Sequence, residues 1–279
     1  MQKIKYKYFI FIIPILIFSG IFFPIINIFI TTLKFDPSKN HLSKDPKYSY
    51  VMLSSDNKIL SKLSRKFEIN NNKHKIPFLL KYSFISAEDK RFLKHNGIDL
   101  IGLSRALMSN INSGYLKEGG STITQQVARL IFLNNDISFQ RKIKEILISL
   151  ILDFRYSKDQ ILKLYLNNIY LGSGAYGINE ASQVYFGKLL NELTLSEIAL
   201  IAGLTPAPSI YSPYENLELA IKNRNQILES MYLDGYISID DRNKAFNEKI
   251  TLNYQTNNNM LNDKLLINFI IEETNNKIK

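Results

Sequence analysis

The sequence contains no cysteine and no tryptophan, and only three histidines. Without cysteine, the protein forms no disulfide and no thiolate metal site. The histidines, His41, His74 and His95, are too scattered along the chain to suggest a zinc site by their spacing. Strand-like alternation of apolar and polar residues is scarce, and the sequence has no internal repeat. These absences exclude a disulfide-stabilised scaffold and give no support to a zinc enzyme or a repeat protein.

Acidic residues are outnumbered by basic ones, and the formal net charge of the 279 residues is +10. Such a charge is compatible with nucleic acid, anionic lipid or a phosphorylated substrate. The N-terminus narrows the choice, because an uncharged run extends from Tyr8 to Ile30. As a helix this run would reach roughly 34 Å, enough to cross a hydrocarbon core of about 30 Å. Lysines precede it at Lys3, Lys5 and Lys7, so the positive-inside rule places the N-terminus in the cytoplasm.

A cleaved signal peptide is the alternative interpretation of this run. Its apolar region normally has about 7–15 residues and ends at small residues. The run from Tyr8 to Ile30 is longer, and no A-x-A-like site follows it. We therefore favour an uncleaved membrane anchor.

The body of the chain, from Ile76 to about Tyr236, has the apolar spacing of helices. Ile143, Ile146 and Leu147, for example, recur at the helical period. Ahead of the body, the turn signal Ser55-Asp56-Asn57 separates two short apolar runs between Tyr50 and Leu63, which predicts a small β-hairpin. The expected class is mainly α.

One motif, Gly119 to Gln126 (GGSTITQQ), predicts a helix start. Its two glycines free the backbone to approach another group closely, and Thr122 and Gln125 have the spacing of a capping box. A glycine turn that leads into a helix N-terminus presents N–H groups suited to a phosphate or pyrophosphate. Judged alone, the motif is more often a plain junction between a loop and a helix.

Acidic residues stand beside basic ones at two further places. Glu88 and Asp89 precede two cations, and Arg141 and Lys142 precede Glu145. Taken singly, such clusters are usually solvated surface charges or helical ion pairs of about 0.2–0.5 kcal/mol. The helix after Glu145 is nearly all apolar, however, so the second cluster is expected to line a cleft. Two such clusters and an anion-binding helix start suggest glycosyl or phosphoryl chemistry, without separating a hydrolase from a transferase.

At these residues the sequence resembles the family 51 glycosyltransferases, which are the transglycosylase domains of class A penicillin-binding proteins and the monofunctional peptidoglycan transglycosylases. Three family motifs are intact: E-D-x-x-F-x-x-H-x-G from Glu88 to Gly97, G-G-S-T-I-T-Q-Q from Gly119 to Gln126, and R-K-x-x-E from Arg141 to Glu145. The stretches Lys158 to Asn167 and Asn223 to Leu228 resemble the fourth and fifth motifs. The sequence departs from the family at Leu130, Lys163 and Asn223, where Asn, Glu and Arg are usual.

The resemblance implies a mainly α, lysozyme-like transglycosylase domain that polymerises lipid II and releases polyprenyl pyrophosphate. Glu88 would be the general base on the acceptor hydroxyl. Glu145 would assist the leaving group through a divalent cation, Mg²⁺, for which it would be the ligand. The residues expected to bind substrate are Asp89, Phe92, His95, Gly120, Ser121, Thr122, Gln125, Gln126, Arg129, Arg141, Lys142 and Arg224.

The lipid tail of such a substrate stays in the bilayer, which implies an apolar lip on the enzyme. Five residues after the first motif are candidates, although core packing explains them equally well: Leu100, Ile101, Leu103, Leu107 and Met108. The expected location is the bacterial inner membrane, with a single pass, the N-terminus inside and the catalytic domain on the periplasmic or extracellular side. The expected partners are lipid II, the growing glycan strand, the membrane and other cell-wall synthesis proteins, and not nucleic acid.

The expected organisation has five parts. These are a cytoplasmic tail (1–7), a transmembrane helix (8–30), a juxtamembrane linker with the hairpin (31–75), the glycosyltransferase domain (76–241) and a linker or truncated tail (242–279). No Ser-x-x-Lys motif follows the transferase region, so the chain looks like a class A protein without its transpeptidase domain. Two alternative functions stay open: a lysozyme-like enzyme that cleaves peptidoglycan, and a decayed, non-enzymatic cell-wall scaffold.

Overall fold

The computed structural model describes residues 50–53, 59–63, 76–115, 119–133 and 138–254, together with Ile26 and Ile30. Most of the expected transmembrane segment and most of the tail lie outside these residues. Within them, no helix combines the length and the apolar character needed to span a membrane. The predicted hairpin is confirmed, because strand β1 (Tyr50–Leu53) pairs antiparallel with strand β2 (Ile59–Leu63).

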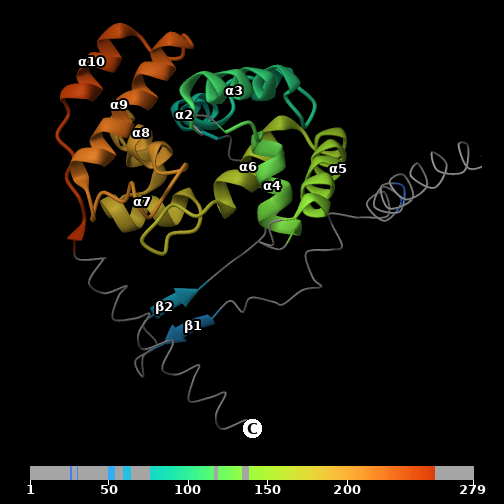
Figure 1. Cartoon of the computed structure of the whole chain (residues 1–279). Helices are drawn as coiled ribbons and strands as arrows, with labels where there is room; N and C mark the ends of the chain where they lie inside the picture. Colours follow the sequence, from blue (N-terminus) through green and yellow to red (C-terminus); the bar gives the residue numbers. More distant parts are fainter. Residues whose placement is uncertain are drawn as a thin grey trace, which may run out of the picture.

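The described part of the body is helical, which confirms the mainly α class. Figure 1 shows α7 to α10 on one side of this body and α4 to α6 on the other, with α2 and α3 between them at the top. The helices are α2 (Phe78–Glu88), α3 (Leu100–Ser113), α4 (Ile123–Phe132), α5 (Phe139–Arg155), α6 (Lys158–Asn168), α7 (Ile178–Phe186), α8 (Leu195–Gly203), α9 (Leu217–Leu233) and α10 (Ile239–Asn247). Short 3₁₀ turns cover Phe92–Lys94 and Leu190–Glu192.

Several helices begin where local side-chain signals specify. Thr122, Ser157 and Thr194 are the N-caps of α4, α6 and α8, and each forms a capping box with the residue three positions later. A cap of this kind typically stabilises a helix by about 1 kcal/mol. The box predicted for Thr122 and Gln125 is therefore confirmed, and it fixes the first residue of α4 at Ile123.

Helix α8 is the centre of the domain. Every residue from Ser196 to Gly203 is buried, and α2, α7, α9 and α10 all contact this helix. A helix that is apolar on all sides needs such surroundings to remove it from water. Helix α8 is thus fixed by its neighbours, and Thr205, just beyond its C-terminal end, contacts Glu88 at the end of α2.

Candidate active site

Glu88, the last residue of α2, is half-buried and has both carboxylate oxygens engaged. Its Oε2 accepts a hydrogen bond of 2.6 Å from Nε2 of Gln126, on the second turn of α4. Its Oε1 accepts one from the hydroxyl of Thr205, just beyond α8. Both donors are neutral, so they orient the carboxylate without supplying a counter-charge.

Asp89 follows directly but faces another environment, as expected for adjacent acids. Its side chain is buried, and its Oδ2 lies 3.0 Å from Nε2 of His95. The same oxygen accepts a hydrogen bond of 3.0 Å from the backbone N–H of Ile123, the first residue of α4. Asp89 and His95 therefore hold the end of α2 against the start of α4.

Three N–H groups at the start of α4, where we predicted an anion site, are already used within the protein. The backbone N–H of Thr122 is taken by Oε1 of Gln125, and that of Gln125 by Oγ1 of Thr122. Oδ2 of Asp89 takes the N–H of Ile123. A helix N-terminus attracts any nearby anion, and here the protein supplies its own. Thr122, Gln125 and Asp89 therefore build the start of α4, and their predicted binding of substrate stays a prediction.

The first motif also contacts α4 and α5 through its glycine. The hydroxyl of Thr122 donates a hydrogen bond of 2.6 Å to the carbonyl oxygen of Gly97. Gly97 has a φ of +83°, and a Cβ on it would lie 2.6 Å from the backbone oxygen of Ser149 in α5. A side chain at this position would separate the two segments. The glycine that ends the first motif thus allows a close backbone contact with α5.

Glu145 lies in the first half of α5 and is only 1% exposed. Its Oε2 accepts a hydrogen bond of 2.6 Å from Nη1 of Arg141, and its Oε1 accepts one from Nζ of Lys142. Lys142 also donates to the hydroxyl of Ser121 at 3.0 Å, and its side chain is 41% exposed. The third motif is therefore joined to the glycine turn, and one of its two cations reaches solvent.

The surroundings of Glu145 do not fit a resident divalent cation. Mg²⁺ prefers oxygen ligands, whereas both oxygens of Glu145 already accept from cationic groups. Across the described residues, no three His, Cys, Asp or Glu side chains are grouped so that they could hold a metal ion. The predicted Mg²⁺ at Glu145 stays a prediction that this donor set does not favour.

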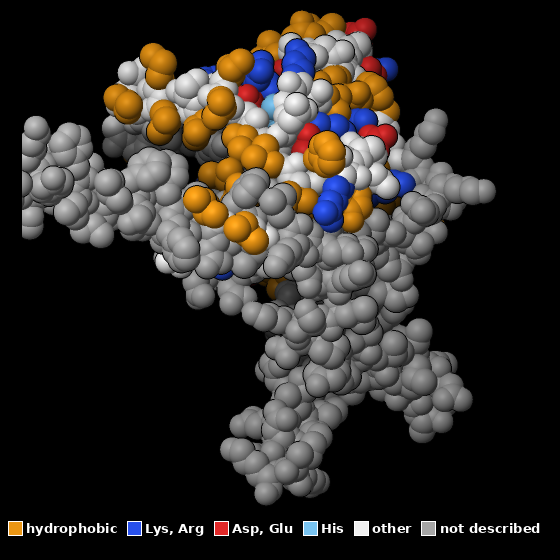
Figure 2. Space-filling model, turned by 90° about the vertical axis from the view of Figure 1, so that its right-hand side faces the viewer, with side chains coloured by type: hydrophobic (Ala, Val, Ile, Leu, Met, Phe, Trp, Pro, Cys, Tyr) orange, Lys and Arg blue, Asp and Glu red, His pale blue; other side chains and the backbone are white. Residues whose placement is uncertain are grey.

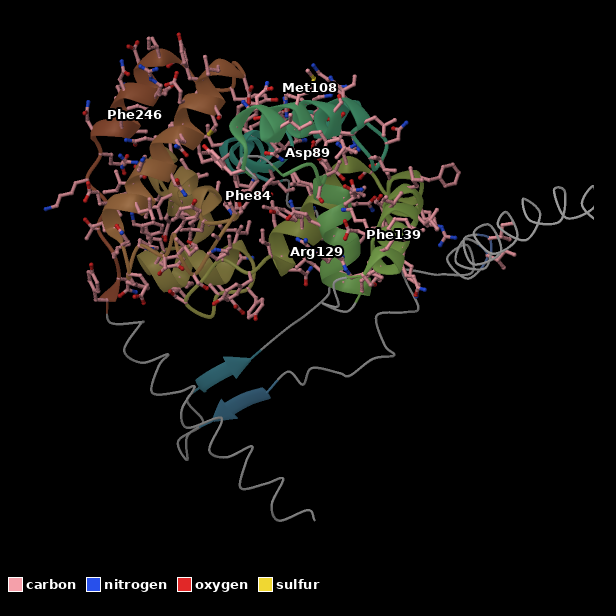
Figure 3. All side chains as sticks on the ribbon, in the orientation of Figure 1. Phe84, Asp89, Met108, Arg129, Phe139 and Phe246 are labelled. Atoms are coloured by element: carbon pink, nitrogen blue, oxygen red, sulfur yellow. The ribbon has the colours of Figure 1, made fainter. Side chains whose placement is uncertain are left out.

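The remaining predicted residues divide between the interior and the surface. Phe92 is fully buried, with Nζ of Lys158 4.7 Å from its ring centroid and His95 packed edge-on. Arg129 is exposed on α4, one turn beyond Gln126 (Figure 3). Phe92 therefore supports the site from the protein interior, whereas Arg129 is exposed and available to a ligand.

Arg224 lies in the interior, away from Glu88 and the start of α4. All five guanidinium N–H donors are used inside the protein, on the side chains of Ser196 and Asn225 and on the backbone oxygens of Phe246 and Glu248. Ser196 lies at the N-terminal end of α8, whereas Glu88 meets the chain beyond its C-terminal end. We therefore correct its role from substrate binding to structural support. Burial lowers the pKa of Arg224, and the nearby Glu248 carboxylate opposes this shift.

Two residues near Glu88 had no signal in the sequence. Thr205 is 117 residues away along the chain. Tyr165 of α6 is fully buried, and its hydroxyl has no partner among the described residues. Burial, and secondly the charge of Glu88, raises the pKa of Tyr165 well above its usual range. The phenol therefore stays neutral beside the carboxylate.

Helix α3 exposes apolar side chains next to the site. Only Ala106 of this helix is buried. A Cβ on Gly120 would lie 2.7 Å from Cδ1 of Leu103, so the glycine turn packs directly against α3. We call the exposed residues the α3 apolar surface: Leu100, Ile101, Leu103, Leu107, Met108 and Ile111.

The exposure of the α3 apolar surface bears on the two explanations given for its residues, an apolar lip for a lipid tail and core packing. Its members are 40% to 77% exposed, so core packing is wrong for them. Figure 2 shows hydrophobic side chains gathered on one face of the molecule, and Figure 3 shows Met108 on the outer side of α3. Soluble proteins rarely expose so many contiguous apolar residues unless the surface meets a membrane, a ligand or a partner.

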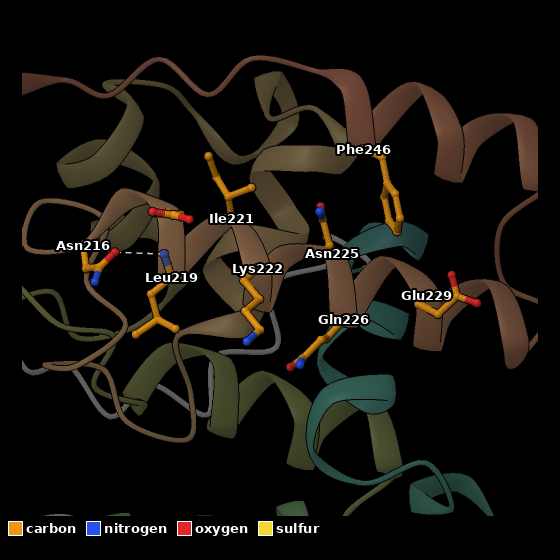
Figure 4. A pocket seen from close by; sticks show the side chains of 9 residues that line it. Asn216, Leu219, Ile221, Lys222, Asn225, Gln226, Glu229 and Phe246 are labelled. Atoms are coloured by element: carbon orange, nitrogen blue, oxygen red, sulfur yellow. Dashed lines mark hydrogen bonds between the residues drawn. The ribbon is translucent and has the colours of Figure 1, made fainter.

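A separate open pocket lies along α9, with Phe246 of α10 at one end (Figure 4). It contains none of the predicted site residues. One of its two acidic residues, Glu229, is paired with Arg242 at 2.7 Å, and Asn216 caps α9 by accepting from the N–H of Leu219. We therefore place the candidate active site at the start of α4, where three motifs meet, and not in this pocket.

Comparison with known proteins identifies the family of the chain. A family model described as "Transglycosylase" matches residues 56–232, which include all three intact motifs. The chain therefore belongs to the transglycosylase family.

Individual relatives lead to the same family. The chain is 41% identical over 201 residues to penicillin-binding protein 1A of Escherichia coli, covering 72% of this chain and 24% of that protein. It is 43% identical over 209 residues to the Pseudomonas aeruginosa protein of that name, covering 75% and 25%. A crystal structure of Haemophilus influenzae penicillin-binding protein 1A matches 72% of this chain and 20% of its own, with 26% identity and a TM-score of 0.42. The chain thus spans about a quarter of the length of these curated relatives.

Proposed function

We propose that the protein is a peptidoglycan glycosyltransferase that polymerises lipid II into glycan strands and releases polyprenyl pyrophosphate. The observation that carries this proposal is the difference between two carboxylates on either side of α4. Glu88 has only neutral hydrogen-bond donors, whereas Glu145 is enclosed by two cations. A site with one basic carboxylate and one cationic cluster suits the transfer of a sugar from a pyrophosphate.

In the proposed reaction, Glu88 takes the proton from the acceptor sugar hydroxyl as its oxygen attacks the anomeric carbon of the donor. The bond between that carbon and the pyrophosphate oxygen breaks, and the pyrophosphate leaves with the electron pair. Gln126 and Thr205 orient Glu88 for this step through their two hydrogen bonds. Because neither donor is charged, no salt bridge has to break when Glu88 accepts the proton.

The leaving pyrophosphate needs positive charge. Lys142 and Arg141 are held together by Glu145, and Arg129 projects from the exposed side of α4. Arg forms bidentate hydrogen bonds with phosphate oxygens, and Lys supplies a compact charge. A retaining or inverting hydrolase would instead need a second carboxyl group as an acid. Glu145 is engaged by two cations and is not available for that role, which favours the transferase.

The decisive experiment is a lipid II polymerisation assay in detergent, with Glu88→Gln as the paired variant. We expect polymer from the unchanged protein and a loss of about 10²–10⁴-fold in the variant, because general base catalysis contributes about that much. Folding of both proteins is checked by thermal unfolding. Cleavage of finished peptidoglycan without polymerisation would support the hydrolase instead, and neither activity from the folded protein would support the scaffold.

The proposed location is the bacterial inner membrane, through an anchor at residues 8–30, with the catalytic domain on the outer side. The α3 apolar surface supports this, because it would lie against the bilayer that carries the lipid substrate. The proposed partners are lipid II, the glycan strand, the membrane and other cell-wall synthesis proteins.

Because the chain has no tryptophan, one introduced tryptophan reports on membrane contact without background. Met108→Trp on α3 is expected to give a blue-shifted emission in vesicles of anionic phospholipid. Leu233→Trp on α9, where Leu233 is 70% exposed, is the matched control and is expected to stay at the solvent wavelength. Identical emission from the two variants would contradict membrane contact through α3.

A further inference from the structure

The hydroxyl of Thr205 has two acceptors within reach. It donates to Oε1 of Glu88, and it lies 3.0 Å from the backbone oxygen of Ala202, in the last turn of α8. The residue is partly exposed, and it follows a helix that is packed on all sides. Its backbone is therefore held in place while its hydroxyl faces the candidate base.

A hydroxyl has one proton and two lone pairs, so Thr205 cannot donate to both acceptors at once. When Glu88 is ionised, its carboxylate is the stronger acceptor, because hydrogen bonds to charged groups are stronger than neutral ones. When Oε1 of Glu88 carries a proton, that proton can be donated to Oγ1 of Thr205, and the hydroxyl proton of Thr205 turns to Ala202. The Nε2 group of Gln126 cannot reverse in this way, because it only donates.

We propose that Thr205 is a positioning residue for Glu88 and keeps its contact with that side chain in both protonation states. It orients the carboxylate before the proton transfer and accepts a hydrogen bond from the carboxyl group afterwards. No proton is gained or lost by Thr205: the proton from the acceptor hydroxyl stays on Glu88 until solvent removes it. This inference rests on the proposed role of Glu88 as the base.

The first test compares Thr205→Val, which keeps the shape and removes the hydroxyl, with Thr205→Ser, which keeps the hydroxyl. Without the donor the ionised form of Glu88 is less stabilised. The acid limb of the kcat/KM profile for lipid II is therefore expected to move up by about one pH unit, with about tenfold lower activity on that limb. Thr205→Ser is expected to recover most of the loss. A merely structural role would lower stability without moving the acid limb.

The inference is overturned if Thr205→Val leaves the acid limb in place, or if Thr205→Ser behaves like Thr205→Val. Thr205→Ala provides a second hydroxyl-free variant if valine prevents folding, which thermal unfolding detects. Its acid limb is then read in the same way.

A second readout separates this inference from the proposed function. The carboxyl signal of Glu88 is followed by ¹³C NMR against pH without substrate, and the signal missing in Glu88→Gln provides its assignment. The midpoint of this titration is expected at higher pH in Thr205→Val. If the midpoint shifts in Thr205→Val but the unchanged protein makes no polymer, the contact between Thr205 and Glu88 is supported and the polymerase function is rejected. If the midpoint does not shift but the unchanged protein makes polymer, the proposed role of Thr205 is rejected and the polymerase function stands.

Discussion

Glu88 and Glu145 have similar sequence surroundings but different partners in the fold. Each carboxylate has two neighbouring cations within four residues in the sequence. Lys90 and Arg91 follow Glu88, and Arg141 and Lys142 precede Glu145. In the structure, the cations that follow Glu88 turn elsewhere: Lys90 lies 3.3 Å from Asp234, and Arg91 lies 3.1 Å from Asp99. Arg141 and Lys142, by contrast, both bind Glu145. Proximity in sequence therefore does not decide which acid is neutralised.

This difference is the basis of the role that we propose for each residue. The carboxylate of Glu88 is oriented by two neutral donors and forms no ion pair with them. A carboxylate with two cations compensates their charge and holds them together. Because Glu145 is almost fully buried, its pairs with Arg141 and Lys142 are shielded from water more than a surface ion pair would be. The first site is suited to a base, and the second to the binding of an anion.

The largest effect is expected from Glu145→Gln, which tests whether Glu145 holds the two cations in place. The amide keeps the shape but leaves Arg141 and Lys142 without their counter-charge. We expect activity to fall about 10²-fold, as on loss of a group that stabilises transition-state charge, and stability to fall by about 1–3 kcal/mol. Polymerisation kinetics and urea unfolding measure the two effects. Lys144→Gln, on the exposed side of the same turn, is the matched control and should change neither. Wild-type activity in Glu145→Gln would remove the assigned role.

A smaller effect is expected from Asp89→Asn. This variant tests whether Asp89 has a structural role, in contrast to the adjacent Glu88, the proposed base. The change removes the charge that satisfies the start of α4 and faces His95. We expect a loss of about 1–3 kcal/mol in the free energy of unfolding, and a smaller fall in activity than in Glu88→Gln. Urea unfolding and kinetics at a temperature where both variants are folded make the comparison. If Asp89→Asn abolished polymerisation with unchanged stability, Asp89 would contact the substrate after all.

The smallest effect is expected from Tyr165→Phe. The buried hydroxyl has no partner in the described part of the chain, so its removal should leave stability unchanged or raise it by up to about 1 kcal/mol. The position of the acid limb for polymerisation should also be unchanged. A shift of that limb would identify Tyr165 as an additional donor to Glu88 and would sharpen the description of the base.

Much of the fold was predictable from local patterns. The capping box at Thr122, the helical apolar spacing in α5 and the hairpin from Tyr50 to Leu63 are all present in the structure. These features act over a few residues, so the sequence states them directly. The same local pattern could not indicate that a carboxylate from α2 accepts from the N–H of Ile123 at the start of α4, because that contact is tertiary.

The site was predictable as a set of motifs but not as a set of roles. Three motifs meet at the start of α4, as their resemblance to the family implied. Arg224 belongs to the fifth motif, and its guanidinium is nevertheless used entirely inside the protein. The exposure of the α3 apolar surface could not be read from its residues, because a run of Leu, Ile and Met packs equally well into a core.

The sequence by itself determined the helices, their caps, the hairpin and the presence of two acids with basic neighbours, because these depend on contacts within about four residues. Only the tertiary structure decided which groups those acids meet. Glu88 bonds to Gln126, which is 38 residues away, and to Thr205, which is 117 residues away. Such contacts exist because α2, α4 and α8 pack together, and packing is a property of the whole core. The motif therefore specifies the proposed base, and the fold supplies the two groups that orient it.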